Sequence, residues 1–151
     1  MRFVASSIVL PALAFGLCCA PAFAIDERID QQTMAALLVK AEQAAPKEQC
    51  FLYAELVHQM TELAGQQYSS GDDDHASQTL RLVQKYAEKI HMGVAQDGKK
   101  LKNAEELMRH TSFRLNGILN AASYEDRQAL QATLKQLEQV QTELMMQVFK
   151  K

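Results

Sequence analysis

The segment 73–120, DDHASQTLRLVQKYAEKIHMGVAQDGKKLKNAEELMRHTSFRLNGILN, carries the longest apolar pattern of the chain. A position on one face recurs every three or four residues, which is the repeat of an α-helix. The series runs through Leu80, Val83, Ala87, Ile90, Val94, Asp97, Leu101, Ala104, Met108, Thr111, Leu115, Ile118 and Ala122. Because a loop has no reason to preserve helical phase, we predict one continuous helix, roughly 70 Å long at 1.5 Å per residue. Gly93 and Gly98 favour the alternative, a break near residues 96–99.

The segments on either side of this one are rich in good helix formers and have clear boundaries. A first helix is expected over 26–44, and Pro46 suits the first turn of a second helix that stops near Ser70. The run Asp72–Asp74 is predicted to cap and charge-stabilise the next helix start, because it lacks the spacing of a calcium loop. Ser123 to Asp126 resembles a capping box and predicts the start of the last helix.

These elements predict an all-α fold. The reversal at residues 120–123 is too short for anything but a tight turn, so the last helix should fold back along the second half of the long one. By the same logic, the second helix should lie along its first half, and the first helix should cover the remaining apolar surface. The expected architecture is an elongated up-and-down helical bundle, coiled-coil-like, with one long central helix at about 73–120 flanked by antiparallel helices.

Composition and charge limit the classes of partner. The chain has 151 residues, 48% of them hydrophobic, and a formal net charge of −2. That length suits one domain with an adequate core, and the near-neutral charge argues against nucleic-acid binding. No second long apolar stretch follows the N-terminal one, so no membrane insertion of the processed chain is expected.

The N-terminus has the three parts of a secretory signal peptide. Met1-Arg2 is followed by an apolar run over 3–17 and by Ala22-Phe23-Ala24, with small residues at the −3 and −1 positions of a cleavage site. We expect residues 1–24 to be a cleaved signal and 25–151 to be a single helical domain that is exported, either periplasmic or secreted. Lipid attachment at Cys18 or Cys19 is the alternative, but larger residues stand where that signal needs small ones.

Cys50 is the one cysteine that remains after such cleavage. We predict that it is a small buried hydrophobe near the start of the second helix. The alternative is an intermolecular disulfide or a reactive thiol, which an odd cysteine in an exported protein permits.

Motifs that carry chemistry are few. Glu55 and His58 have the Glu-x-x-His spacing of di-iron bundles, but such sites need a second copy, so they are weak metal candidates and are expected to be a solvated pair. We found no catalytic motif and no cofactor-binding motif, and we predict no catalytic residues, no cofactor and no enzyme activity. The methionines and histidines leave a metal- or haem-binding bundle as the alternative.

The function expected from the sequence is that of an exported, non-catalytic interaction or scaffold protein, including chaperone-like binding. The long apolar seam should be least covered near its middle, from Val94 to Leu101, where the second and last helices reach their ends. An uncovered seam would accept a helix of a protein partner or a second copy of the chain.

The predicted signal peptide can be tested through the mass of the mature protein. Protein purified from its native host should have an intact mass that corresponds to a start at Ile25. A mass that retains Cys18, or that carries a diacylglyceryl group, would contradict cleavage after Ala24.

Overall fold

All regular structure in the part of the chain that is described is helical. The structure, a computed structural model, describes residues 31–93 and 100–150. The predicted signal peptide and Val94 therefore lie outside the described residues. The helices are α1 (Gln31–Gln43), α2 (Pro46–Ser69), α3 (Asp73–Gly93), α4 (Leu101–Ala121) and α5 (Tyr124–Phe149).

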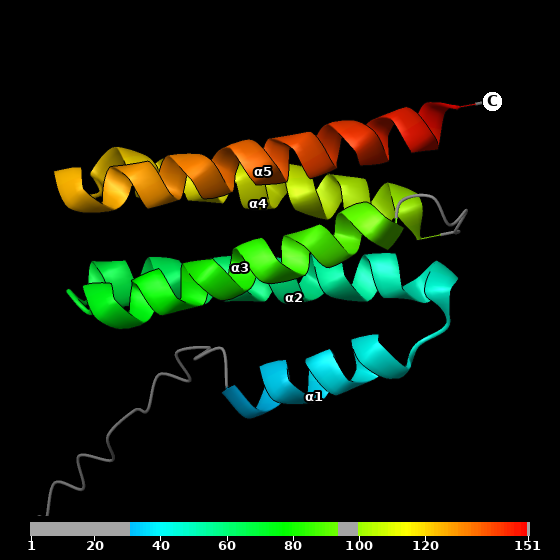
Figure 1. Cartoon of the computed structure of the whole chain (residues 1–151), viewed down its shortest axis with the longest axis horizontal. Helices are drawn as coiled ribbons and strands as arrows, with labels where there is room; N and C mark the ends of the chain where they lie inside the picture. The colour runs from blue at the N-terminus through cyan, green and yellow to red at the C-terminus, as the bar shows by residue number, and fades with distance from the viewer. Residues whose placement is uncertain (1–30, 94–99, 151) are drawn as a thin grey trace, which may run out of the picture.

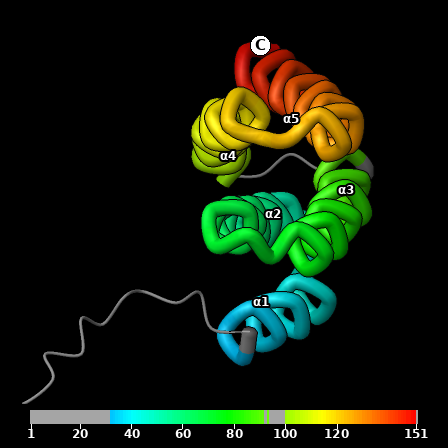
Figure 2. The backbone as a smooth tube through the Cα atoms, turned by 90° about the vertical axis from the view of Figure 1, so that its left-hand side faces the viewer, coloured from blue at the N-terminus to red at the C-terminus, as the bar shows by residue number. Residues whose placement is uncertain are grey.

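The helices form an up-and-down bundle in three layers. Figure 2 shows α1 on one side, the α2–α3 pair in the middle and the α4–α5 pair on the other side. Consecutive helices run in opposite directions, and the α2–α3 turn lies at the same end as the α4–α5 turn (Figure 1). The prediction of an all-α up-and-down bundle is confirmed.

The prediction of one continuous helix at 73–120 is wrong. The start of α4 lies beside the start of α2, since the Lys100 ammonium sits 5.4 Å from the centroid of the Phe51 ring. The other end of α4 lies beside the end of α2, where a Cβ on Gly65 would be 3.0 Å from Cδ1 of Ile118. The chain therefore reverses direction between Gly93 and Leu101, and α4 runs parallel to α2.

The reversal has a physical reason in α2, the helix that is central in place of the predicted one. Its buried residues surround more than half of the helix and are Cys50, Leu52, Tyr53, Ala54, Leu56, Val57, Met60, Thr61, Ala64 and Gly65. The helix contacts α1, α3 and α4. In a straight helix over 73–120, the apolar side chains of the second half would lie far from α2. They would be exposed to water, and so would one apolar face of α2. Folding back buries both surfaces.

The apolar register itself is confirmed within each of the two helices. Leu80, Val83, Ala87 and Ile90 of α3 are buried. So are the α4 positions Leu101, Ala104, Met108, Thr111, Leu115 and Ile118. Each helix needs a 3.6-residue stripe of its own to face one shared core, and the two stripes happen to be in phase across the segment between them.

The predicted helix starts agree with the structure where they can be compared. Pro46 occupies the first turn of α2. Ser123 caps α5, because its side-chain oxygen accepts a hydrogen bond from the Asp126 amide at 3.3 Å. Asp73 and Asp74 stand in the first turn of α3, where their negative charge interacts favourably with the positive end of the helix dipole.

Candidate functional site: a cavity between two helical hairpins

A cavity of about 350 Å³ opens at the end of the bundle where the α2–α3 turn meets the α4–α5 turn. We call it the end cavity. From the first hairpin, α2 contributes Gly65, Tyr68 and Ser69, and α3 contributes Asp73. The second hairpin lines it with Arg114, Gly117, Ile118, Ala121, Ala122, Ser123 and Asp126.

Small side chains create this space. Glycines at positions 65 and 117 stand in the interior of helices, where glycine costs about 1 kcal/mol relative to alanine. A Cβ on Gly65 would press on Ile118 at 3.0 Å, so glycine permits the close approach of α2 and α4. A Cβ on Gly117 would meet nothing within 4 Å, so that wall of the cavity is open.

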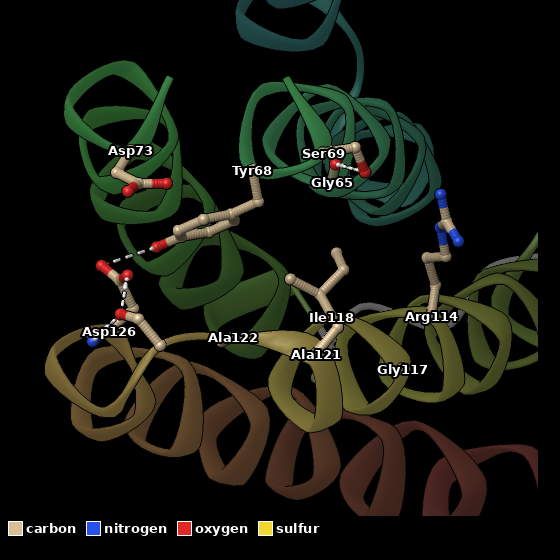
Figure 3. A pocket seen from close by; sticks show the side chains of 11 residues that line it. Gly65, Tyr68, Ser69, Asp73, Arg114, Gly117, Ile118, Ala121, Ala122 and Asp126 are labelled. Atoms are coloured by element: carbon tan, nitrogen blue, oxygen red, sulfur yellow. Dashed lines mark hydrogen bonds between the residues drawn. The ribbon is translucent and has the colours of Figure 1, made fainter. Parts of the chain in front are cut away.

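Arg114 lies on the opposite side of the end cavity from Tyr68, Asp73 and Asp126 (Figure 3). On one side the Arg114 Nε donates to Oε2 of Glu62 at 3.0 Å, which pairs the charges of α4 and α2. On the other side the Tyr68 hydroxyl donates to Oδ1 of Asp126 at 3.4 Å, and the Asp73 carboxylate lies nearby. The Ser123 hydroxyl donates to Oδ2 of Asp126 at 2.5 Å.

The Tyr68 hydroxyl remains a donor at neutral pH. Burial raises the pKa of Tyr68. A hydrogen bond with Ser77 opposes this shift, and the negative charges of Asp126 and Asp73 add to it because they disfavour a phenolate beside them. The cavity therefore presents an aromatic ring, a neutral phenol and two carboxylates on one side.

The sequence-predicted site residues that the structure describes do not line this cavity; they are Cys50, Glu55, His58 and Leu101. Leu101 is only 7% exposed and belongs to the core, so it does not offer the uncovered seam that was expected. The reason is the chain reversal, which turns the middle of the supposed long helix into the packed start of α4. Cys50 is buried and free, as predicted, and burial raises the pKa of its thiol to about 11.

His58 is half-buried at the α2–α4 interface rather than a purely solvated partner of Glu55. Its Nδ1 lies 3.0 Å from Oγ1 of Thr111. The Thr111 hydroxyl also lies 2.7 Å from the Leu107 carbonyl oxygen, to which it donates. His58 thus contacts α4 through Thr111, a contact that sequence spacing could not indicate.

No three His, Cys, Asp or Glu side chains within residues 31–93 and 100–150 are placed to hold a metal ion together. Among the described helices, none combines the length and apolar character needed to cross a bilayer. Comparison of the chain with protein-family models, with curated proteins and with solved structures found no match. The functional argument therefore depends on the geometry of the end cavity.

Sequence reasoning missed the end cavity because its lining comes from four helices. Gly65 and Asp73 are separated from Gly117 and Asp126 by most of two helices. The signal that could have found it is the pair of mid-helix glycines, which cost helix stability and so indicate a packing or binding role.

The partly buried His58 predicts a specific pH dependence of stability. Burial lowers its pKa in the folded state; Glu62 and Glu55 oppose this shift, and His110 adds to it. Because the unfolded chain then binds the proton more readily, the fold loses stability as pH falls below about 6.5. In urea titrations, His58→Gln should remove part of this loss between pH 8 and pH 5.

His75→Gln is the matched control, with the opposite sign. A hydrogen bond to Asp72 and the charge of that carboxylate raise the pKa of the exposed His75 in the folded state. Protonation of His75 therefore favours folding, so His75→Gln should cost more stability at pH 5 than at pH 8. Parallel pH profiles for wild type and His58→Gln would contradict the assignment.

Proposed function

We propose that this protein is an exported, non-catalytic helical binding module and that the end cavity is its ligand site. The observation that carries the proposal is the cavity itself, whose volume of about 350 Å³ falls within the range of small-molecule sites. Its lining combines apolar side chains such as Ile118 and Ala121 with polar ones such as Tyr68, and small-molecule sites likewise combine apolar surface with placed polar groups. Export is supported by the signal-like pattern of residues 1–24.

The polar groups that line the cavity favour binding over catalysis. Its described lining contains no histidine, cysteine or lysine. The Ser69 hydroxyl donates to the Gly65 carbonyl at 2.7 Å, and the Ser123 hydroxyl donates to Asp126. Neither serine has a neighbouring histidine to act as its general base, so the set lacks an activated nucleophile.

The cavity proposal is tested by filling the cavity. Purified protein is screened by thermal shift against a library of small cations, anions and neutral compounds. A true ligand at a hundred times its Kd should stabilise the fold by about 2.7 kcal/mol. Gly117→Trp should abolish the shift, because the indole would extend from a position with open space beside it.

Asn103→Trp is the control for the indole itself, since it is exposed near the other end of the same helix. It should leave the thermal shift unchanged. If every compound that binds wild type also binds Gly117→Trp, the end cavity is not the ligand site. A library that produces no shift at all would contradict the binding function.

A second candidate function, self-association, is favoured by the exposed apolar residues at the end of α5. Met145, Met146 and Phe149 lie within one face of the last turns, and Met146 and Phe149 are 58% and 75% exposed. We call them the C-terminal apolar face. Burying such residues against a second copy of the chain would contribute roughly 1.5–3 kcal/mol per fully buried side chain.

Self-association is tested by sedimentation velocity over a range of protein concentrations. We expect wild type to form dimers and the double variant Met146→Ser, Phe149→Ser to be a monomer with unchanged helicity. Phe113→Ser is the control, because Phe113 is 81% exposed but lies on α4. Monomeric wild type at every concentration would exclude this candidate.

A further inference from the structure

Two helix pairs make the packing interface between the two hairpins. Helix α2 packs against α4 and α3 packs against α5, whereas α3 and α4 are not packed against each other within the described residues. Side-chain contacts across this interface include His58 with Thr111, Glu62 with Arg114, and Gln84 with Thr133. Straightening the chain between α3 and α4 would therefore break contacts between the hairpins and none within either hairpin.

Each hairpin holds together through contacts of its own. In the first hairpin, the Tyr53 and Tyr86 rings stack with their centroids 6.1 Å apart, and α2 packs along α3. In the second, α4 packs along α5, and Figure 2 shows the two pairs as separate layers. A hairpin that separates from its partner exposes a buried surface that fits only the other hairpin. It can regain that contact from its own chain or from a second copy.

The apolar stripes of α3 and α4 are related in a way that two separate helices do not require. Ile90 closes the buried stripe of α3, and Leu101 opens that of α4 about three helical turns further along. A single straight helix needs this spacing, because both of its halves must then face the same side. In the sequence, Val94 and Asp97 stand at the positions that continue the series, and residues 94–100 contain no proline.

We propose that two copies of this chain form a dimer by exchanging their α4–α5 hairpins. In this dimer, α3 and α4 join into one straight helix, and the α4–α5 hairpin of each copy packs against α2 and α3 of the other. The contacts between hairpins are all re-formed. Each end cavity then takes its α2–α3 wall from one copy and its α4–α5 wall from the other. The exchange is independent of the ligand proposal and of the C-terminal apolar face.

The dimer should respond to the helix propensity of the connection between α3 and α4. Replacing glycine by alanine inside a helix favours the helix about fivefold. Each dimer holds two connections, so Gly98→Ala should lower the concentration of half-dimerisation by about 25-fold. Both proteins are refolded from urea over a range of concentrations, and dimers are measured by size-exclusion chromatography. Wild type should dimerise near millimolar concentration, because its own hairpin competes at about that effective concentration.

Asn116→Ala is the matched control. Asn116 is exposed in the interior of α4, which is helical in the monomer and in the exchanged dimer alike. This variant also raises helix propensity, but it should change the concentration of half-dimerisation less than about twofold. An equal effect of Asn116→Ala and Gly98→Ala, or a Gly98→Ala protein that stays monomeric at every concentration, would show the proposal to be wrong.

A distance within one chain identifies the exchange itself. Spin labels are attached at Arg81→Cys and Arg109→Cys, two exposed positions, in a Cys50→Ala background. Labelled chains are refolded with an excess of unlabelled chains, and the dimer fraction is measured by double electron–electron resonance. One straight helix places the labels about 42 Å apart at 1.5 Å per residue. The monomer should give a much shorter distance, because α4 folds back beside the first hairpin.

A dimer that shows only the short distance of the monomer would overturn the exchange. It would leave self-association through the C-terminal apolar face as the explanation of the dimer, and the Met146→Ser, Phe149→Ser variant tests that explanation separately.

Discussion

The burial of α2 on three sides is the constraint on which the rest of the structure depends. Ala54 and Leu56 both have no exposed surface, although they point to nearly opposite sides of the helix. Burying a leucine or valine side chain fully contributes roughly 1.5–3 kcal/mol, comparable with a large share of the stability of a small domain. The chain therefore gains by wrapping α1, α3 and α4 around α2, and α5 then closes the second pair of helices.

The same wrapping explains where the end cavity forms. Two hairpins that pack side by side must each end in a turn, and both turns lie at one end of the bundle. Core side chains fill the space between hairpins along their length, but at this end the facing positions are Gly65, Gly117, Ala121 and Ala122. Residues too small to meet across the interface leave a space, and the starts of α3 and α5 beside it supply its two carboxylates.

Much of the fold could be predicted from the sequence, because helix periodicity and caps are local signals. Pro46 and Ser123 marked helix starts correctly, and the buried positions of α3 and α4 follow the predicted stripe. The prediction of one helix over 73–120 was wrong because two separate helices that face one core can carry apolar stripes in the same phase. A shared phase therefore does not show that the helix is continuous. The end cavity could not be predicted, since its Asp73 and Asp126 become neighbours only after the two hairpins dock. The partial burial of His58 could not be predicted either, because it depends on the packing of α4 against α2.

The burial of Cys50 has a consequence for the reactivity of its thiol. Its thiol lies against the end of α3, where a Cβ on Gly93 would be 3.4 Å from its own Cβ, and its pKa of about 11 keeps it protonated. Thiol–disulfide exchange needs an accessible thiolate, so Cys50 is unreactive toward it while the bundle is closed. Separation of α3 from α2 would expose the sulfur. Packing at this contact therefore limits how often the thiol can react, and its rate of modification becomes a measure of how often the bundle opens there.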